Sequence, residues 1–187
     1  MVIPARRGAA AAVHEPISEV ARVLGVDPGL TRTGWAVVVA DGQRYRAIDA
    51  GVIAPRASAQ LGSRLAEGYA RFTTLLEVHR PDLVVIEDLF TTPRFPKAAL
   101  KMAHLRGVLC LAAELAAVPV LPLTATTVKQ RLTGNGHASK EQVQRVAFHL
   151  CDIEAVRVAS DLSDAIALAI AGLHQLRALS GGQLTGR

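Results

Sequence analysis

The chain has 187 residues, half of them hydrophobic, and a formal net charge of +5 at neutral pH. This length and composition suit one compact domain with a full core. No apolar run approaches the roughly 20 residues that a membrane-spanning helix needs, so we expect a cytoplasmic protein without a membrane segment. The basic excess is compatible with an anionic partner, although many basic domains bind none.

Both ends of the chain differ in composition from the middle. Residues 1–22 begin with a basic and Ala-rich stretch that faintly imitates a secretion signal, but Pro16 and its polar neighbours cut the apolar part short. We therefore interpret 1–22 as a flexible extension. The tail 180–187 is Gly-rich and has no core to join, so we expect it to be flexible as well. One domain, residues 23–179, remains between them.

The hydrophobic pattern predicts a group of strands followed by alternating strands and helices. In chain order we expect strands over 23–27, 34–40 and about 44–53, a helix over about 60–79, a strand over 83–87, a helix over about 97–117, a strand over 119–123, and three helices of which the last spans about 161–179. Short turns join the first three strands, with Asp41-Gly42 as a hairpin signal, so these strands should be antiparallel neighbours. The later strands need parallel crossovers. The expected fold is α/β, a mixed β-sheet flanked by α-helices.

Two of the last three helices carry clear start signals. Thr124 can cap the first of them, and Ser139 with Gln142 forms a capping box at the start of the second. The last helix should bury a single apolar stripe, made of Leu162, Ile166, Ile170 and Leu173.

Four acidic residues stand where an apolar element would normally exclude charge. Asp27 and Glu87 each close a run of aliphatic residues, a pattern typical of buried strands whose ends reach a cleft. Asp161 and Asp164 open the otherwise apolar last helix and, three residues apart, share one helix face. Acids at a helix start are also favoured by the macrodipole, so this pair alone is ambiguous. Together with Asp27 and Glu87, the pair favours a shared cation site.

The composition of this group indicates which cation it would hold. Clustered carboxylates without His or Cys suit Mg²⁺ or Mn²⁺ better than Zn²⁺, and Mg²⁺ keeps waters that phosphate oxygens can replace. The turn 28–34 after Asp27 is Gly-rich, which lets backbone approach a phosphate or a neighbouring strand. Ribonuclease H-like nucleases and actin-like ATPases both place an Asp followed by Gly at the first hairpin. The ATPases need two such lobes, and this chain is too short for them.

Six segments resemble, in order, the signature segments of the RuvC Holliday-junction resolvases. They are Gly25–Trp35, Ile86–Phe90, Ala99–Val108, Val128–Gln130, Lys140–Gln144 and Ser160–Ala169. The resemblance covers about residues 23–175. It implies a ribonuclease H-like fold and a homodimer that cuts four-way DNA junctions with Mg²⁺. It also implies the RuvA-RuvB branch-migration complex as a partner.

The resemblance assigns roles to seven residues. The four catalytic metal ligands would be Asp27, Glu87, Asp161 and Asp164. Lys129 and Lys140 match basic residues near the scissile phosphate, with solvated surface charge as the alternative. Phe90 matches the aromatic residue that stacks on bases at the junction centre, with a core role as its alternative. The loop 91–96 departs from the family pattern, because it carries two prolines where a polar loop is usual.

The expected chemistry is phosphodiester hydrolysis assisted by two Mg²⁺ ions, with Mn²⁺ as a possible substitute. Two ions about 3.5 to 4 Å apart can activate the attacking water and stabilise the leaving 3′ oxygen together. The products would be a 5′-phosphate and a 3′-hydroxyl. A non-catalytic nucleic-acid-binding scaffold and a nuclease for simple duplexes or hybrids are the alternatives. Buried acids without metal are costly, which argues against the scaffold.

Overall fold

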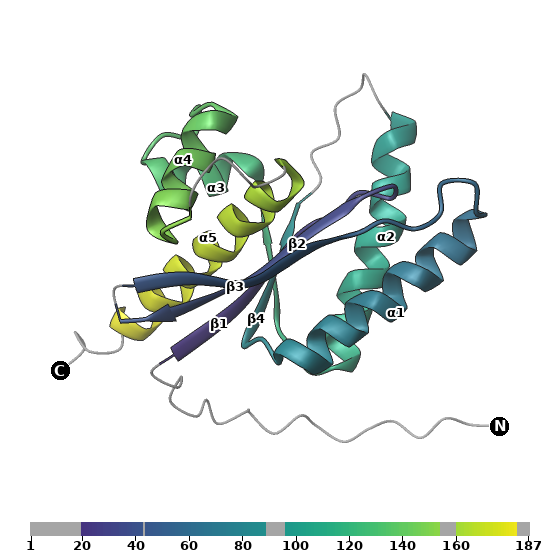
Figure 1. The fold of residues 1–187 in the computed structure, drawn as a ribbon, viewed down its shortest axis with the longest axis horizontal. Helices are drawn as coiled ribbons and strands as arrows, with labels where there is room; N and C mark the ends of the chain where they lie inside the picture. Colours follow the sequence, from purple (N-terminus) through teal and green to yellow (C-terminus); the bar gives the residue numbers. More distant parts are fainter. Residues whose placement is uncertain (1–19, 43, 89–95, 154–159, 183–187) are drawn as a thin grey trace.

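The computed structural model describes residues 20–42, 44–88, 96–153 and 160–182, which form one sheet with helices on both of its faces (Figure 1). The elements are β1 (Val20–Asp27), β2 (Thr33–Asp41), β3 (Arg44–Ile53), α1 (Leu61–His79), β4 (Leu83–Glu87), α2 (Pro96–Leu115), β5 (Val120–Leu123), α3 (Ala125–Thr133), α4 (Lys140–Leu150) and α5 (Ser160–Gly182). Among these helices, none combines the length and apolar character needed to cross a membrane.

The sheet has five strands in the order β3-β2-β1-β4-β5. The first three strands pair antiparallel, whereas β4 pairs parallel with both β1 and β5. The expected mixed sheet is therefore confirmed. In the β1–β4 register, Val26 lies opposite Ile86, so the next residues, Asp27 and Glu87, end adjacent parallel strands side by side.

Two boundaries lie three residues outside those expected. Strand β1 begins at Val20, so residues 20–22 belong to the sheet rather than to the extension. Arg22 interrupts the apolar run, but its backbone N–H donates to the Asp82 carboxylate at 2.7 Å and its guanidinium donates to the carbonyl of His79. Helix α5 continues to Gly182, three residues past its expected end. Residues 1–19 and 183–187 lie outside the described ranges, so their assignment as flexible ends stays a prediction.

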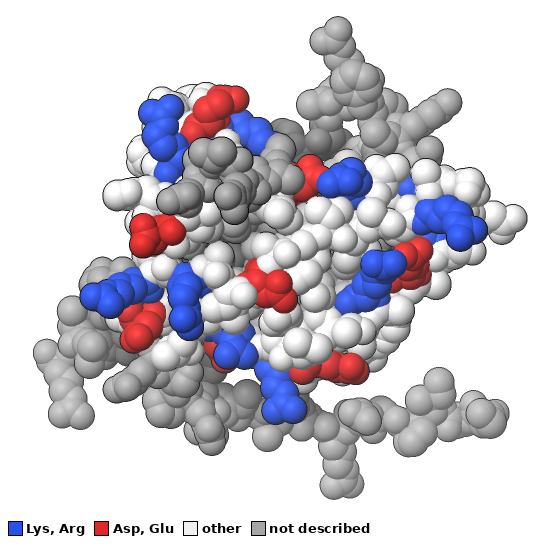
Figure 2. Space-filling view, in the orientation of Figure 1, with Lys and Arg blue, Asp and Glu red and all other residues white. Residues whose placement is uncertain are grey.

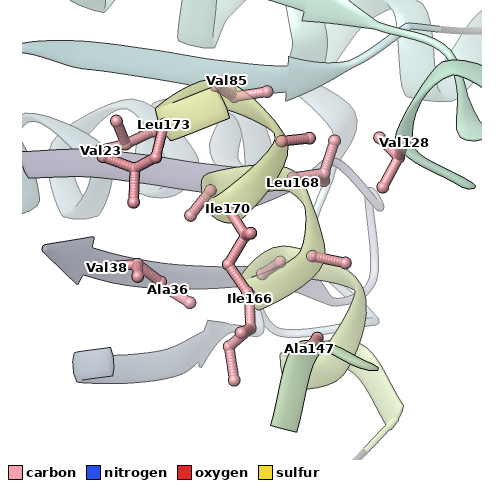
Figure 3. Packing of buried hydrophobic residues seen from close by; sticks show 14 of the residues in the cluster. Val23, Ala36, Val38, Val85, Val128, Ala147, Ile166, Leu168, Ile170 and Leu173 are labelled. Carbon is pink, nitrogen blue, oxygen red and sulfur yellow. The ribbon is translucent and has the colours of Figure 1, made fainter. Parts of the chain in front are cut away.

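Helices α1 and α2 cover one face of the sheet, while α5 covers the other beneath α3 and α4 (Figure 1). Every residue of α5 from Ala165 to Leu173 is buried, whereas Leu162 is only partly buried. The expected burial of Ile166, Ile170 and Leu173 is confirmed, but the single stripe was wrong: from Ala165 to Leu173, α5 is a middle layer that is apolar all round. Figure 3 shows this packing, with α5 side chains between the sheet residues Val23, Val38 and Val85 and the outer-layer residues Val128 and Ala147.

The two expected helix starts are confirmed. The Thr124 hydroxyl accepts a hydrogen bond from the backbone N–H of Thr127 at 3.2 Å. At α4, the Ser139 hydroxyl accepts from the Gln142 N–H, and the Gln142 side chain accepts from the Ser139 N–H at 2.8 Å. These caps fix where α3 and α4 begin beside α5.

Candidate active site

The acids of β1 and β4 meet at the carboxyl ends of these strands. The Glu87 carboxyl donates a hydrogen bond to the Asp27 carboxylate, so the two groups hold one proton between them. Burial, helped by the charge and hydrogen bond of Asp27, raises the pKa of Glu87 to about 8. Burial also raises the pKa of Asp27, against the opposing effect of the hydrogen bond from Glu87. Ionisation of this pair is thus unfavourable without a nearby cation, and a bound cation would stabilise the ionised carboxylates.

The two acids of α5 are each paired with a basic side chain. Asp164 Oδ2 lies 2.5 Å from Lys140 Nζ, and Asp161 Oδ2 accepts a hydrogen bond from Arg32 Nε at 2.7 Å. Burial opposes the charge of Lys140, but the hydrogen bond and charge of Asp164 outweigh it and raise the pKa of the lysine. The charges of both α5 acids also raise the pKa of Asp27, so all four acids interact electrostatically.

The structure brings the four expected ligands into one region without closing them around a common point. Within the described ranges, no three Asp, Glu, His or Cys side chains are grouped as tightly as a metal ion requires. The physical reason is visible in the pairing, because Lys140 and Arg32 draw the α5 carboxylates toward themselves. The donor set still fits Mg²⁺, since it offers carboxylate oxygens only and includes a half-buried pair whose charge Lys140 compensates only in part.

A cavity of about 220 Å³ adjoins these acids. Glu87 and Asp164 line it together with Lys129 and Lys140, and its remaining wall is made of small and aliphatic residues of α3, α4 and α5. Both sequence-predicted lysines therefore face the region of the acids. Phe90 and most of the loop 91–96 lie outside the described residues, so the expected stacking role stays a prediction.

Close backbone contacts hold α5 against the strand ends. A Cβ added at Gly25 would lie 2.1 Å from the Ala165 carbonyl oxygen, and one at Gly34 would lie 2.2 Å from that of Asp161. Only glycine leaves room for this approach of backbone to backbone. The glycines at these positions thus set how near the α5 acids come to Asp27.

Three arginines near the site were not expected from the sequence. Arg32 pairs with Asp161, Arg64 donates to the Leu30 carbonyl at 2.5 Å, and Arg106 pairs with Asp88 at 2.9 Å. The last two brace the segments that follow Asp27 and Glu87. A signal existed for Arg64, which stands one turn before the buried stripe of α1, where a cation needs a partner.

The sheet order, with a helix carrying acids packed against β1 and β2, defines a protein of the ribonuclease H-like class. Residues 23–172 match the family model described as crossover junction endodeoxyribonuclease RuvC. Because this match covers most of the sequence, the chain belongs to the RuvC family of crossover junction endodeoxyribonucleases.

Individual relatives agree with this assignment. A crossover junction endodeoxyribonuclease RuvC of Rhodopirellula baltica is 41% identical over 150 residues, which are 80% of this chain and 84% of the relative. The RuvC structure of Thermus thermophilus has a TM-score of 0.78 at 31% identity, covering 83% of this chain and 95% of that one. The Thermus thermophilus RuvC in complex with a Holliday junction substrate has a TM-score of 0.75 at 27% identity with the same coverage. The expected family and fold are confirmed.

Proposed function

We propose that the protein is a structure-selective endonuclease that resolves four-way DNA junctions in recombination and repair by paired, symmetric phosphodiester hydrolysis. The observation that carries this proposal is that two family-matching acids, Glu87 and Asp164, line one cavity together with Lys129 and Lys140. Asp27 adjoins this cavity through its hydrogen bond with Glu87. The related protein from Thermus thermophilus has been seen with a Holliday junction substrate, which supports the same substrate class here.

Mg²⁺ is the proposed cofactor, two ions per site, with Mn²⁺ as a substitute. The ligands would be Asp27, Glu87, Asp161 and Asp164. When bound, the cations would supply charge stabilisation for the attacking water and the leaving 3′ oxygen. The Asp27–Glu87 pair must first lose its shared proton, because a carboxylate binds a hard cation only when ionised. Lys140 and Arg32 must also give up the α5 carboxylates.

The two lysines of the cavity have a further role in the proposal, which Lys140 can take up once it has left Asp164. Lys140 is exposed and Lys129 partly buried, and both line the cavity beside Glu87. At this place an ammonium group can hold a DNA phosphate near the acids without reading sequence. Figure 2 shows basic and acidic side chains interspersed on one face of the molecule rather than separated into large fields. The position of both lysines in the wall of the cavity therefore supports DNA binding here more than net charge does.

A homodimer is the proposed assembly, because a nearly two-fold symmetric junction needs one active site for each of two opposing strands. Helix α2 offers a surface for it: Leu100, Leu111 and Leu115 are 62%, 54% and 67% exposed and follow one side of the helix. Exposed apolar stripes of this kind mark interaction surfaces. Partnership with the RuvA-RuvB complex rests on family resemblance alone and stays a prediction.

The test compares a four-way junction with a linear duplex of the same sequence in Mg²⁺. We expect paired nicks with 5′-phosphate ends in the junction and little cleavage of the duplex. Equal cleavage of both substrates would favour the simple-duplex nuclease. Binding without cleavage in Mg²⁺ or Mn²⁺ would favour the scaffold. Light scattering on the same samples checks for the dimer, and Leu115→Glu should shift it toward monomer.

A further inference from the structure

Arg32 is an exposed basic residue in the turn between β1 and β2, and its partner is one of the proposed metal ligands. Its Nε donates to Asp161 Oδ2 at 2.7 Å. The side chains are 57% and 34% exposed, so the ion pair lies at the solvent-facing rim of the site. The sequence motifs assigned no role to Arg32. The roles proposed for the two lysines and for the Asp27–Glu87 pair do not account for a basic residue beside Asp161.

The backbone on both sides of this ion pair is held firmly. The buried Thr33 hydroxyl donates to the Gly29 carbonyl at 2.9 Å, and Arg64 donates to the Leu30 carbonyl, which together close the turn that carries Arg32. At Gly34 the backbone of β2 touches the first turn of α5, where Asp161 lies. The Arg32–Asp161 pair can therefore separate by rotation of its side chains while these backbone contacts stay in place.

This pair is poised for exchange. Exposed ion pairs are weak, whereas a divalent cation attracts a carboxylate with twice the charge and at shorter range. A cation bound by Asp161 would therefore displace the guanidinium of Arg32. Released at the rim of a site that takes DNA phosphates, this planar group matches phosphate oxygens in shape and charge.

We propose, on the basis of the nuclease function proposed above, that Arg32 is a metal-linked DNA contact: it neutralises Asp161 in the metal-free protein and transfers to a DNA phosphate when a divalent cation takes that carboxylate. Arg32 would thus bind the substrate backbone and take no part in the hydrolysis itself. Through Arg32, binding of a cation at Asp161 would strengthen binding of the DNA backbone.

The first test measures metal binding without DNA, by calorimetric titration with Mn²⁺. Arg32→Ala removes the competitor for Asp161 and should tighten binding by about two- to fivefold, the range that exposed ion-pair energies correspond to. The matched control is Arg71→Ala, because the Arg71–Glu67 pair on α1 has a separation of 2.8 Å and the same exposed fractions. That control should leave Mn²⁺ affinity unchanged. Unchanged or weaker Mn²⁺ binding by Arg32→Ala would overturn the proposal.

The second test measures how junction binding in EDTA depends on salt. Asp161→Asn should release Arg32 without metal and steepen the slope of log affinity against log salt by about 0.9, the value for one phosphate contact. When Arg32→Ala is added to Asp161→Asn, this gain should disappear. The same steepening in both backgrounds would show that the loss of the Asp161 charge, and no contact by Arg32, caused it.

These results are separable from a failure of the proposed nuclease function. If the parent protein bound Mn²⁺ no better than its Asp27→Asn variant, the metal site itself would be wrong, and the role of Arg32 with it. If the parent bound Mn²⁺ and cut junctions while Arg32→Ala changed neither metal affinity nor salt slope, the role of Arg32 alone would be wrong. Thermal melting of each variant checks that it is folded.

Discussion

The acids at the strand ends and the acids at the start of α5 belong to one site but are held differently. Asp27 and Glu87 sit on neighbouring strands, are largely screened from solvent, and share a hydrogen bond with each other. Asp161 and Asp164 stand on a helix, and each is paired with a basic side chain from another element. The strand acids are therefore fixed by sheet register, whereas the helix acids are adjustable through their counter-ions. Such a site has a rigid half that waits for a cation and a half that must change partners to accept one.

The largest expected effect comes from breaking the rigid half. Asp27→Asn removes a carboxylate that no other group can replace at that place, so cleavage in Mg²⁺ should be abolished. Junction binding in Ca²⁺ should remain, because the basic residues are untouched. Glu87→Gln and Asp164→Asn should behave likewise. Glu67→Gln, an acid on α1 that pairs with Arg71, is the control and should cut normally. Full cleavage by Asp27→Asn would remove that residue from the mechanism.

The second prediction concerns the close contact between β1 and α5, which holds the helix acids near the strand acids. Because a Cβ at Gly25 would collide with the Ala165 carbonyl of α5, Gly25→Ala should cost about 1 to 3 kcal/mol or more of unfolding free energy. Denaturant unfolding measures this loss. Gly62→Ala is the matched control, since a Cβ at that helical position meets nothing within 4 Å and alanine favours helix. Equal stability of the two variants would mean that α5 can shift away from β1 at no cost.

These two halves were also unequally predictable from the sequence. Asp27 and Glu87 could be placed because a strand end is visible as an apolar run that stops at a charge. The ion pairs of Asp161 and Asp164 could not be predicted, because their partners are distant in sequence. Arg32 lies 129 positions from Asp161, and Lys140 lies 24 positions from Asp164. The burial of α5 on all sides was missed for a similar reason. The periodicity of a helix shows which of its faces is apolar. It does not show that α3 and α4 pack on the outer side of α5, because that packing is tertiary structure.

The start of β1 illustrates the same limit on a smaller scale. From the sequence, Arg22 was assigned to the end of a polar extension. In the structure its guanidinium donates to the carbonyl of His79 at the end of α1. Local signals were reliable where the partner was local, as at the Ser139–Gln142 capping box. The antiparallel pairing of the first three strands and the parallel direction of the later ones followed from turn lengths and crossover rules, which need no knowledge of side-chain partners.

The third prediction concerns the pH dependence of stability, which reports the proton held by Asp27 and Glu87. The pKa of Glu87 is about 8 in the fold against 4.5 ordinarily, so between these values the folded state binds more protons than the unfolded state. Stability then falls as pH rises. The metal-free protein in EDTA should lose on the order of 1 to 3 kcal/mol from this group between about pH 4.5 and 8. The stabilisation is complete below pH 4.5 and gone above pH 8.

Thermal melting across this range provides the measurement. Glu87→Gln cannot ionise and should flatten the pH profile, while Glu67→Gln, at a partly exposed position of α1, should leave it as in the parent. Added Mg²⁺ should also flatten the profile, because the cation favours the ionised pair that high pH produces. A parent profile that rises from pH 5 to 8 in EDTA would contradict the raised pKa.

The smallest expected effect sharpens the comparison at the adjustable half. Lys140 pairs with Asp164 across the cavity, whereas Lys129 lines the same cavity from α3. If both lysines hold DNA phosphates, replacing either one with Ala should weaken junction binding for all sequences and reduce the salt slope by about 0.9. Lys140→Ala should in addition tighten Mn²⁺ binding, since it frees Asp164, and Lys129→Ala should not. Junction titrations at several salt concentrations and Mn²⁺ calorimetry give both quantities. A sequence-dependent loss of affinity, or an unchanged salt slope, would make these lysines surface charges without a phosphate contact.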